Sequence, residues 1–205
     1  MQAIAEILKT GSETLNLTAS QEQIDQLLGL LQLLQKWNQS FNLTAVNDLQ
    51  RLAIWHVLDS LALSPFLYGN RMLDVGTGAG FPGLPLAILH SDQYFVLLDS
   101  NLKKIRFVRQ VVLELGLDNV EVMHRRFQEY QPDCQFDTVL ARAVSSLADM
   151  VDNVARLVTG GGRLLLPKGQ FPQAELNELN DYQYSVLKLE IPGMDAQRHL
   201  VRIDC

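Results

Sequence analysis

The sequence contains few cysteines, and none of them lies close to a histidine in a metal-binding pattern. Of the 205 residues only two are cysteines, Cys134 and Cys205, and four are histidines. A structural zinc site needs four such ligands at short spacings, and a disulfide framework needs more cysteines. We therefore expect no metal and no disulfide scaffold. This cysteine usage suits the reducing cytoplasm.

Long apolar runs are also missing. The most apolar segments, 27–34 and 84–89, are far shorter than the roughly 20 residues of a membrane span. Residues 1–9 carry Glu6 and lack the basic start, long apolar run and cleavage site of a signal peptide. We expect a cytoplasmic protein with no membrane partner.

The chain lacks an excess of positive charge, because its formal net charge is −6. This charge argues against a protein that coats nucleic acid through bulk electrostatics. The bases are nevertheless unevenly distributed, and segment 101–126 leaves room for a local basic face. Its bases are Lys103, Lys104, Arg106, Arg109, Arg125 and Arg126.

Residues 1–68 are predicted to be helical, as an appendage that packs on a sheet within one domain of residues 1–205. An apolar stripe with helical spacing favours a helix that begins after Thr18 or Ser20. The stripe consists of Ile24, Leu27, Leu28, Leu31 and Leu34. A second helical pattern covers residues 48–63 and ends before Pro65.

From Arg71 onward, short β-branched runs alternate with helical patterns. Five strands are expected at 72–75, 94–98, 120–123, 138–141 and 163–167. Helices are expected at 82–90, at 100–115 before Gly116, and at 145–158 before the glycines 160–162, with a short one at 172–180. This alternation predicts an α/β fold with a mostly parallel sheet. Strands at 184–191 and 199–203 are expected to form an antiparallel hairpin at its edge.

The strongest local signal is a glycine-rich loop, DVGTGAGFPG, at residues 74–83. It joins the first expected strand to the first expected sheet helix, where open parallel sheets bind ligands. Gly76, Gly78 and Gly80 have no Cβ, so the backbone can turn sharply and approach a flat or extended ligand closely. The loop therefore predicts a nucleotide-like cofactor.

The glycine spacing favours S-adenosylmethionine over a dinucleotide. The dinucleotide pattern G-x-G-x-x-G would require a glycine where this chain has Phe81. Asp99 ends the second expected strand, where a carboxylate can accept both ribose hydroxyls. A nicotinamide enzyme would place an acid there too, so Asp99 alone does not separate the two. A nicotinamide-dependent oxidoreductase and a non-catalytic ribosome-assembly or RNA-binding module remain the alternatives.

Eight short segments together resemble the bacterial RsmG (GidB) family over nearly the whole chain. They are 42–44 (NLT), 55–56 (WH), 59–61 (DSL), 74–83, 98–100 (LDS), 141–143 (ARA), 167–169 (PKG) and 198–201 (RHLV). The resemblance implies a Rossmann-like class I methyltransferase sheet. It implies methyl transfer from S-adenosyl-L-methionine to N7 of a guanine in 16S ribosomal RNA, guanine 527 of the small ribosomal subunit.

The same resemblance implies cofactor contacts at Gly76, Phe81, Phe127, Gln128 and Arg142. At position 128 the family usually has glutamate, so the residue could bind through its side chain or only through its backbone.

The residues themselves fit a reaction that needs no acid or base. The segment after the fourth expected strand reads ARAV, not the Asp/Asn-Pro-Pro-aromatic pattern that holds an amino group, and no cysteine is placed as a nucleophile. Guanine N7 has a free lone pair, so its methylation requires only orientation. Arg142 and Lys168 are candidates for positioning the guanine. Lys168 and Arg198 are expected to contact RNA phosphates.

Overall fold

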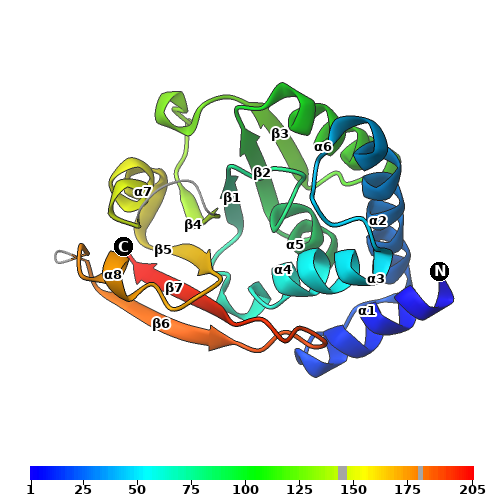
Figure 1. Cartoon of the computed structure of the whole chain (residues 1–205). Coiled ribbons are helices and arrows are strands. Elements are labelled where there is room, and N and C mark those ends of the chain that lie inside the picture. The colour runs from blue at the N-terminus through cyan, green and yellow to red at the C-terminus, as the bar shows by residue number, and fades with distance from the viewer. Residues whose placement is uncertain (143–146, 180–181) are drawn as a thin grey trace.

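The computed structural model describes residues 1–142, 147–179 and 182–205, and its centre is one seven-stranded sheet (Figure 1). The strands follow the spatial order β3-β2-β1-β4-β5-β7-β6. Their bounds are β1 Arg71–Val75, β2 Tyr94–Asp99, β3 Val120–His124, β4 Phe136–Ala141, β5 Val158–Lys168, β6 Tyr184–Leu189 and β7 Arg198–Asp204.

The strand directions confirm the predicted mixed sheet. β1 pairs in parallel with β2 and β4, β2 with β3, and β4 with β5. β7 runs antiparallel to both β5 and β6. The chain order reverses between β1 and β4, and at such a switch point open α/β sheets bind their ligands.

Helices cover both faces of the sheet. The α-helices are α1 Gln2–Thr14, α2 Gln21–Phe41, α3 Leu49–Leu52, α4 Asp59–Leu61, α5 Gly83–Leu89, α6 Leu102–Leu115, α7 Leu147–Val154 and α8 Gln173–Leu176. A π-helical segment, η1, spans Ala53–Leu58, and 3₁₀ turns are η2 Ser64–Phe66, η3 Phe127–Glu129 and η4 Ala155–Leu157.

Two apolar clusters lie on opposite faces of the sheet. One combines the N-terminal helices with α5 and α6, and joins Leu27 and Leu58 to Phe107. The other packs α7 and α8 against the strands around Leu164. Figure 1 shows α2, α5 and α6 on one side and α7 on the other. The N-terminal helices therefore share a core with the sheet.

Local signals place α2 and α6 as predicted. Ser20 is the N-cap of α2, where its hydroxyl accepts from the backbone N–H of Gln23 and the Gln23 side chain accepts from the Ser20 N–H. This reciprocal capping box satisfies two donors that the first turn leaves free. Gly116 ends α6 in the left-handed conformation, as its position in the sequence predicted.

The glycines at 160–162 do not end a helix, which corrects the sequence-based prediction. The helix α7 ends at Val154, and β5 begins at Val158 and includes the three glycines. The pairing of β4 with β5 shifts register between Phe136 and Thr138, so the glycine stretch lies in an irregular part of the ladder. Glycine in a strand often marks such an irregularity. Residues 145, 146 and 180 of the predicted helices lie outside the described residues.

Candidate cofactor and substrate site

A cavity of about 480 Å³ opens at the carboxyl ends of β1 to β4, next to the switch point. Its volume lies within the range of pockets that hold small ligands. The cavity is lined by Gly76, Leu98, Asp99, Ser100, Lys104, Arg125, Arg126, Phe127, Gln128 and Arg142. Four successive strand ends therefore contribute to one site.

The glycine loop is anchored from below by Asp74, the residue before the loop. One carboxylate oxygen of Asp74 accepts from Thr77 Oγ1 at 2.6 Å and from the Gly83 N–H at 2.9 Å. Its other oxygen, Oδ1, is buried and has no partner among the described residues. Burial raises the pKa of Asp74 to about 6. The carboxylate thus fixes both ends of the loop.

Asp99 joins the second strand to the glycine loop. Its Oδ2 accepts from the Gly78 N–H at 2.8 Å, and its Oδ1 accepts from the Asn101 N–H at 2.7 Å. A carboxylate has about four acceptor positions, so both oxygens retain capacity for further donors. A ribose with two adjacent hydroxyls fits this acceptor pair.

The space above Gly78 is open. Gly78 has φ +63°, and a Cβ built there meets no atom closer than Lys104 Nζ at 3.8 Å. At Gly80, by contrast, a Cβ would clash with the side chain of Leu84, so this glycine serves packing and not the ligand approach expected from the sequence. A flat or extended ligand can therefore lie close to the backbone at Gly78.

Five of the seven residues proposed for cofactor binding line this one cavity: Gly76, Asp99, Phe127, Gln128 and Arg142. Gly78 contributes its N–H to Asp99. Phe81 is not among the lining residues, because its ring is buried against His56. Phe81 thus supports the loop from behind.

Several lining residues were not singled out from the sequence as site residues. Leu98 and Ser100 flank Asp99, Lys104 lies in the first turn of α6, and Arg125 and Arg126 follow β3. Their signal was positional, since four of them lie at or just after the carboxyl end of a strand and Lys104 lies in the first turn of the helix that follows β2. The two arginines belong to the basic segment noted in the sequence.

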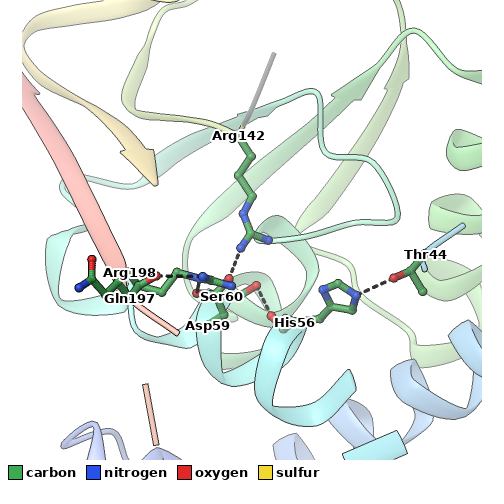
Figure 2. Close-up of polar contacts among 7 residues, drawn as sticks. All are labelled: Thr44, His56, Asp59, Ser60, Arg142, Gln197 and Arg198. Carbon is green, nitrogen blue, oxygen red and sulfur yellow. Dashed lines mark hydrogen bonds and ion pairs between the residues drawn. The ribbon is translucent and has the colours of Figure 1, made fainter. Parts of the chain in front are cut away.

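Arg142, which follows β4, is joined to Arg198 at the start of β7 through a buried carboxylate (Figure 2). Arg142 Nη2 donates to Asp59 Oδ2 in a short contact, and Arg198 Nε donates to Asp59 Oδ1 at 3.0 Å. The side chain of Asp59 is 3% exposed. No local pattern in the sequence indicates that these three residues meet.

Lys168, at the end of β5, pairs with Glu175 of α8 at 2.7 Å. The same Glu175 oxygen accepts from the backbone N–H of Leu147, the first residue of α7. The side chain of Lys168 is 18% exposed. Neither Lys168 nor Arg198 lines the cavity, and Arg198 is connected to it only through Asp59 and Arg142.

His56 lies between Phe81 of the glycine loop and Thr44 of the N-terminal segment. Its Nε2 is 2.9 Å from Thr44 Oγ1, and Figure 2 shows its ring pointing toward Thr44 from the helix that carries Asp59. Burial, with the nearby charge of Arg142, lowers the pKa of His56 to about 4. The imidazole is therefore neutral at pH 7.

Within the described ranges, no three His, Cys, Asp or Glu side chains are grouped as metal ligands. Across the same residues, no helix combines the length and apolar character of a membrane span.

The strand order, the antiparallel edge and the glycine loop beside the switch point define a Rossmann-like methyltransferase fold. Solved structures share it. A SAM-dependent methyltransferase from Aquifex aeolicus aligns with a TM-score of 0.59 at 20% identity and covers 79% of this chain and 96% of its own. A tRNA (uracil-54, C5)-methyltransferase from Pyrococcus abyssi, solved with S-adenosyl-L-homocysteine, aligns with a TM-score of 0.55 at 19% identity. The alignment covers 70% of this chain and 36% of the Pyrococcus abyssi chain.

Sequence comparison places the chain within this class. The family model of rRNA small subunit methyltransferase G, GidB, matches residues 23–201, and the chain belongs to that family. Ribosomal RNA small subunit methyltransferase G from Psychromonas ingrahamii is 46% identical over 190 residues and covers 92% of both chains. Its counterpart from Nitrosococcus oceani is 46% identical over 207 residues and covers 99% of this chain and 96% of the relative.

Proposed function

We propose that this protein transfers a methyl group from S-adenosyl-L-methionine to N7 of a guanine in 16S ribosomal RNA, guanine 527 of the small subunit. The observation that carries the proposal is the cavity in which the glycine loop and Asp99 face one space, in a chain of the rRNA small subunit methyltransferase G family. The relatives' names support ribosomal RNA as the substrate. Choice of N7 and of this guanine follows from the family resemblance.

The cavity residues fit S-adenosyl-L-methionine by their chemistry. When bound, the cofactor supplies an electrophilic methyl group on a sulfonium. Asp99 would accept the ribose hydroxyls, and the open space at Gly78 would admit the ligand next to the backbone. Phe127 offers an apolar wall, and Gln128 offers polar groups of its side chain or backbone.

The chain's own contribution to the chemical step is orientation and exclusion of water. Guanine N7 carries no proton at neutral pH, so no side chain has to remove one. Arg142 lines the cavity and would donate to guanine O6, a contact that arginine makes well. We propose no catalytic acid or base, and Lys168 remains a second candidate for holding the guanine.

RNA would approach across the carboxyl ends of the strands. Lys168 and Arg198 would contact phosphates with donors that Glu175 and Asp59 leave free. Arg125 and Arg126, exposed at the cavity, have no ion pair among the described residues and add positive charge there. Because a chain of net charge −6 has few such contacts, we propose a partly assembled small subunit in the cytoplasm as the preferred substrate.

Chemical cleavage tests the position of the methyl group. Methylation at N7 makes the glycosidic bond labile after borohydride reduction, and aniline then cuts the RNA chain. Small-subunit RNA incubated with the protein and S-adenosyl-L-methionine should gain one new cleavage at guanine 527. A methyl group that resists this treatment would place the modification on another atom.

Ligand-dependent stability tests the cofactor and separates the alternative classes. A ligand at 100 times its dissociation constant adds about 2.7 kcal/mol to the folded state. S-adenosyl-L-homocysteine should therefore raise the melting temperature by several degrees, whereas NAD should not. The opposite result would favour an oxidoreductase, and no response to either ligand would favour a binding module.

A further inference from the structure

Asp59 is a buried carboxylate held between two arginines from distant parts of the chain (Figure 2). Each arginine binds a different carboxylate oxygen. A buried charge persists only with such partners, because moving it out of water is costly. Asp59 therefore depends on both arginines for its burial, and its position in turn restricts both guanidinium groups.

The guanidinium of Arg198 is held by several contacts. Besides Asp59, its Nη1 donates to the backbone oxygen of Gln197 at 3.0 Å, and its guanidinium carbon lies 5.5 Å from the centre of the Trp55 ring. Trp55 and Asp59 belong to adjoining helical segments, so one part of the chain supplies both contacts to Arg198. This leaves Asp59 few alternative positions.

Arg142 is the side that faces the cavity. Asp59 is its only hydrogen-bond or ion-pair partner among residues 1–142, 147–179 and 182–205, and it engages a single terminal nitrogen, Nη2. A guanidinium has five N–H donors, so the others remain available. Arg142 thus lines the cavity while Asp59 holds one end of its planar group.

We infer that Asp59 is a positioning residue for methyl transfer, which orients Arg142 at the cavity through a contact that Arg198 secures. This inference rests on the proposed function. A free arginine side chain prefers to bind guanine through both O6 and N7. That bidentate contact would occupy the lone pair that must attack the methyl group. With Nη2 held by Asp59, Arg142 contacts O6 and leaves N7 unpaired.

A kinetic test compares the wild-type protein with Asp59→Asn on small-subunit particles. Asparagine keeps the shape of the side chain but not the charge that holds both arginines. Because misplacement by about 1 Å can cost roughly 100-fold, kcat should fall by about 10- to 100-fold. KM for the particle should not rise, since a released Arg142 can still bind guanine. The affinity for S-adenosyl-L-homocysteine, measured by calorimetry, should change less than about threefold.

Asp137→Asn is the matched control. Asp137 is a partly buried carboxylate near the amino end of β4, and it accepts from the Asn70 and Arg71 N–H groups. It should lower the melting temperature and leave kcat unchanged. Asp59→Glu, which restores the charge, should recover part of kcat. If Asp59→Asn retains the wild-type kcat, or if Asp137→Asn loses kcat equally, the inference is overturned.

A second readout requires neither activity nor a variant that folds. In ¹⁵N spectra of the wild-type protein, the Nη2 protons of Arg142, which donate to Asp59, should exchange with water at least tenfold more slowly than those of the exposed Arg106. Equal exchange would overturn the positioning role. Wild-type protein that shows slow exchange but methylates no particle would instead refute the proposed function.

Discussion

The imidazole ring of His56 stacks on the phenyl ring of Phe81, with centroids 4.9 Å apart and planes inclined by 28°. His56 belongs to the helical segment η1, and Phe81 lies in the second half of the glycine loop. Stacking is favourable at this separation and adds to the burial of both rings. The N-terminal helices thus support the loop that we propose to hold the cofactor.

The pKa shifts of His56 and Asp74 predict opposite effects of pH on stability. The pKa of His56 is lowered to about 4 from 6.5, so its stabilisation is complete above pH 6.5 and is lost as pH falls toward 4. The pKa of Asp74 is raised to about 6 from 3.8, so its stabilisation is lost as pH rises through 6. Each effect amounts to roughly 3 kcal/mol, and between pH 4 and 6 they offset each other.

Single variants should reveal each slope. In His56→Gln the free energy of unfolding should fall, relative to that of the wild-type protein, as pH rises from 4 to 6, because the opposing shift of His56 is removed while that of Asp74 stays. In Asp74→Asn it should rise over the same range. Urea denaturation at several pH values measures both slopes. Parallel pH profiles for the wild-type protein and the two variants would contradict the assigned shifts.

Gly78→Val should abolish binding of S-adenosyl-L-homocysteine, because the side chain would occupy the open space that the ligand needs. The substitution also strains a residue with φ +63°. Gly116→Val is the matched control, since Gly116 has the same φ and no atom within 4 Å of its Cβ position. Calorimetry should show lost affinity only in Gly78→Val. Unchanged affinity there would place the cofactor elsewhere.

Asp99→Ala should reduce affinity for S-adenosyl-L-homocysteine by roughly 10- to 100-fold, the value of hydrogen bonds to a charged group. Alanine would also free the Gly78 N–H, so a ligand lacking the ribose 2′-hydroxyl is needed to isolate the ribose contact. The wild-type protein should discriminate between the two ligands, and Asp99→Ala should not. Equal discrimination by both proteins would remove Asp99 from the ribose site.

Lys168→Ala should weaken binding of small-subunit RNA and flatten its salt dependence by about one unit of slope. Cofactor affinity should stay unchanged, because Lys168 does not line the cavity. Lys188, which pairs with Glu190 on the edge strand β6, is the control cation. If Lys188→Ala has the same effect as Lys168→Ala, the loss reflects total charge and not a local contact.

The sequence predicted the sheet well because its strands and turns carry local signals. The apolar strands, the Ser20 cap and the glycine at 116 each follow from a few neighbouring residues. The helix end predicted at the glycines 160–162 was wrong because the signal was equally local. Glycine favours a helix end as readily as a strand irregularity.

The side-chain contacts within the site were less predictable than its location. Strand ends placed Gly76, Asp99 and Arg142 at one edge of the sheet, as the parallel topology requires. The partner of Arg142 lies 83 residues away, and that of Arg198 lies 139 residues from it. No local pattern encodes contacts over such separations, because they depend on how the helices pack.

The π-helical segment Ala53–Leu58 makes the spacing along this helix a constraint in its own right. A π-turn holds an extra residue, and such turns often occur at functional sites. Deleting one residue between His56 and Asp59 would rotate one side chain by about 100° relative to the other. His56 and Asp59 could then no longer face Phe81 and Arg142 together, although neither would have been replaced. In a deletion series, this stretch should tolerate substitutions better than changes of length.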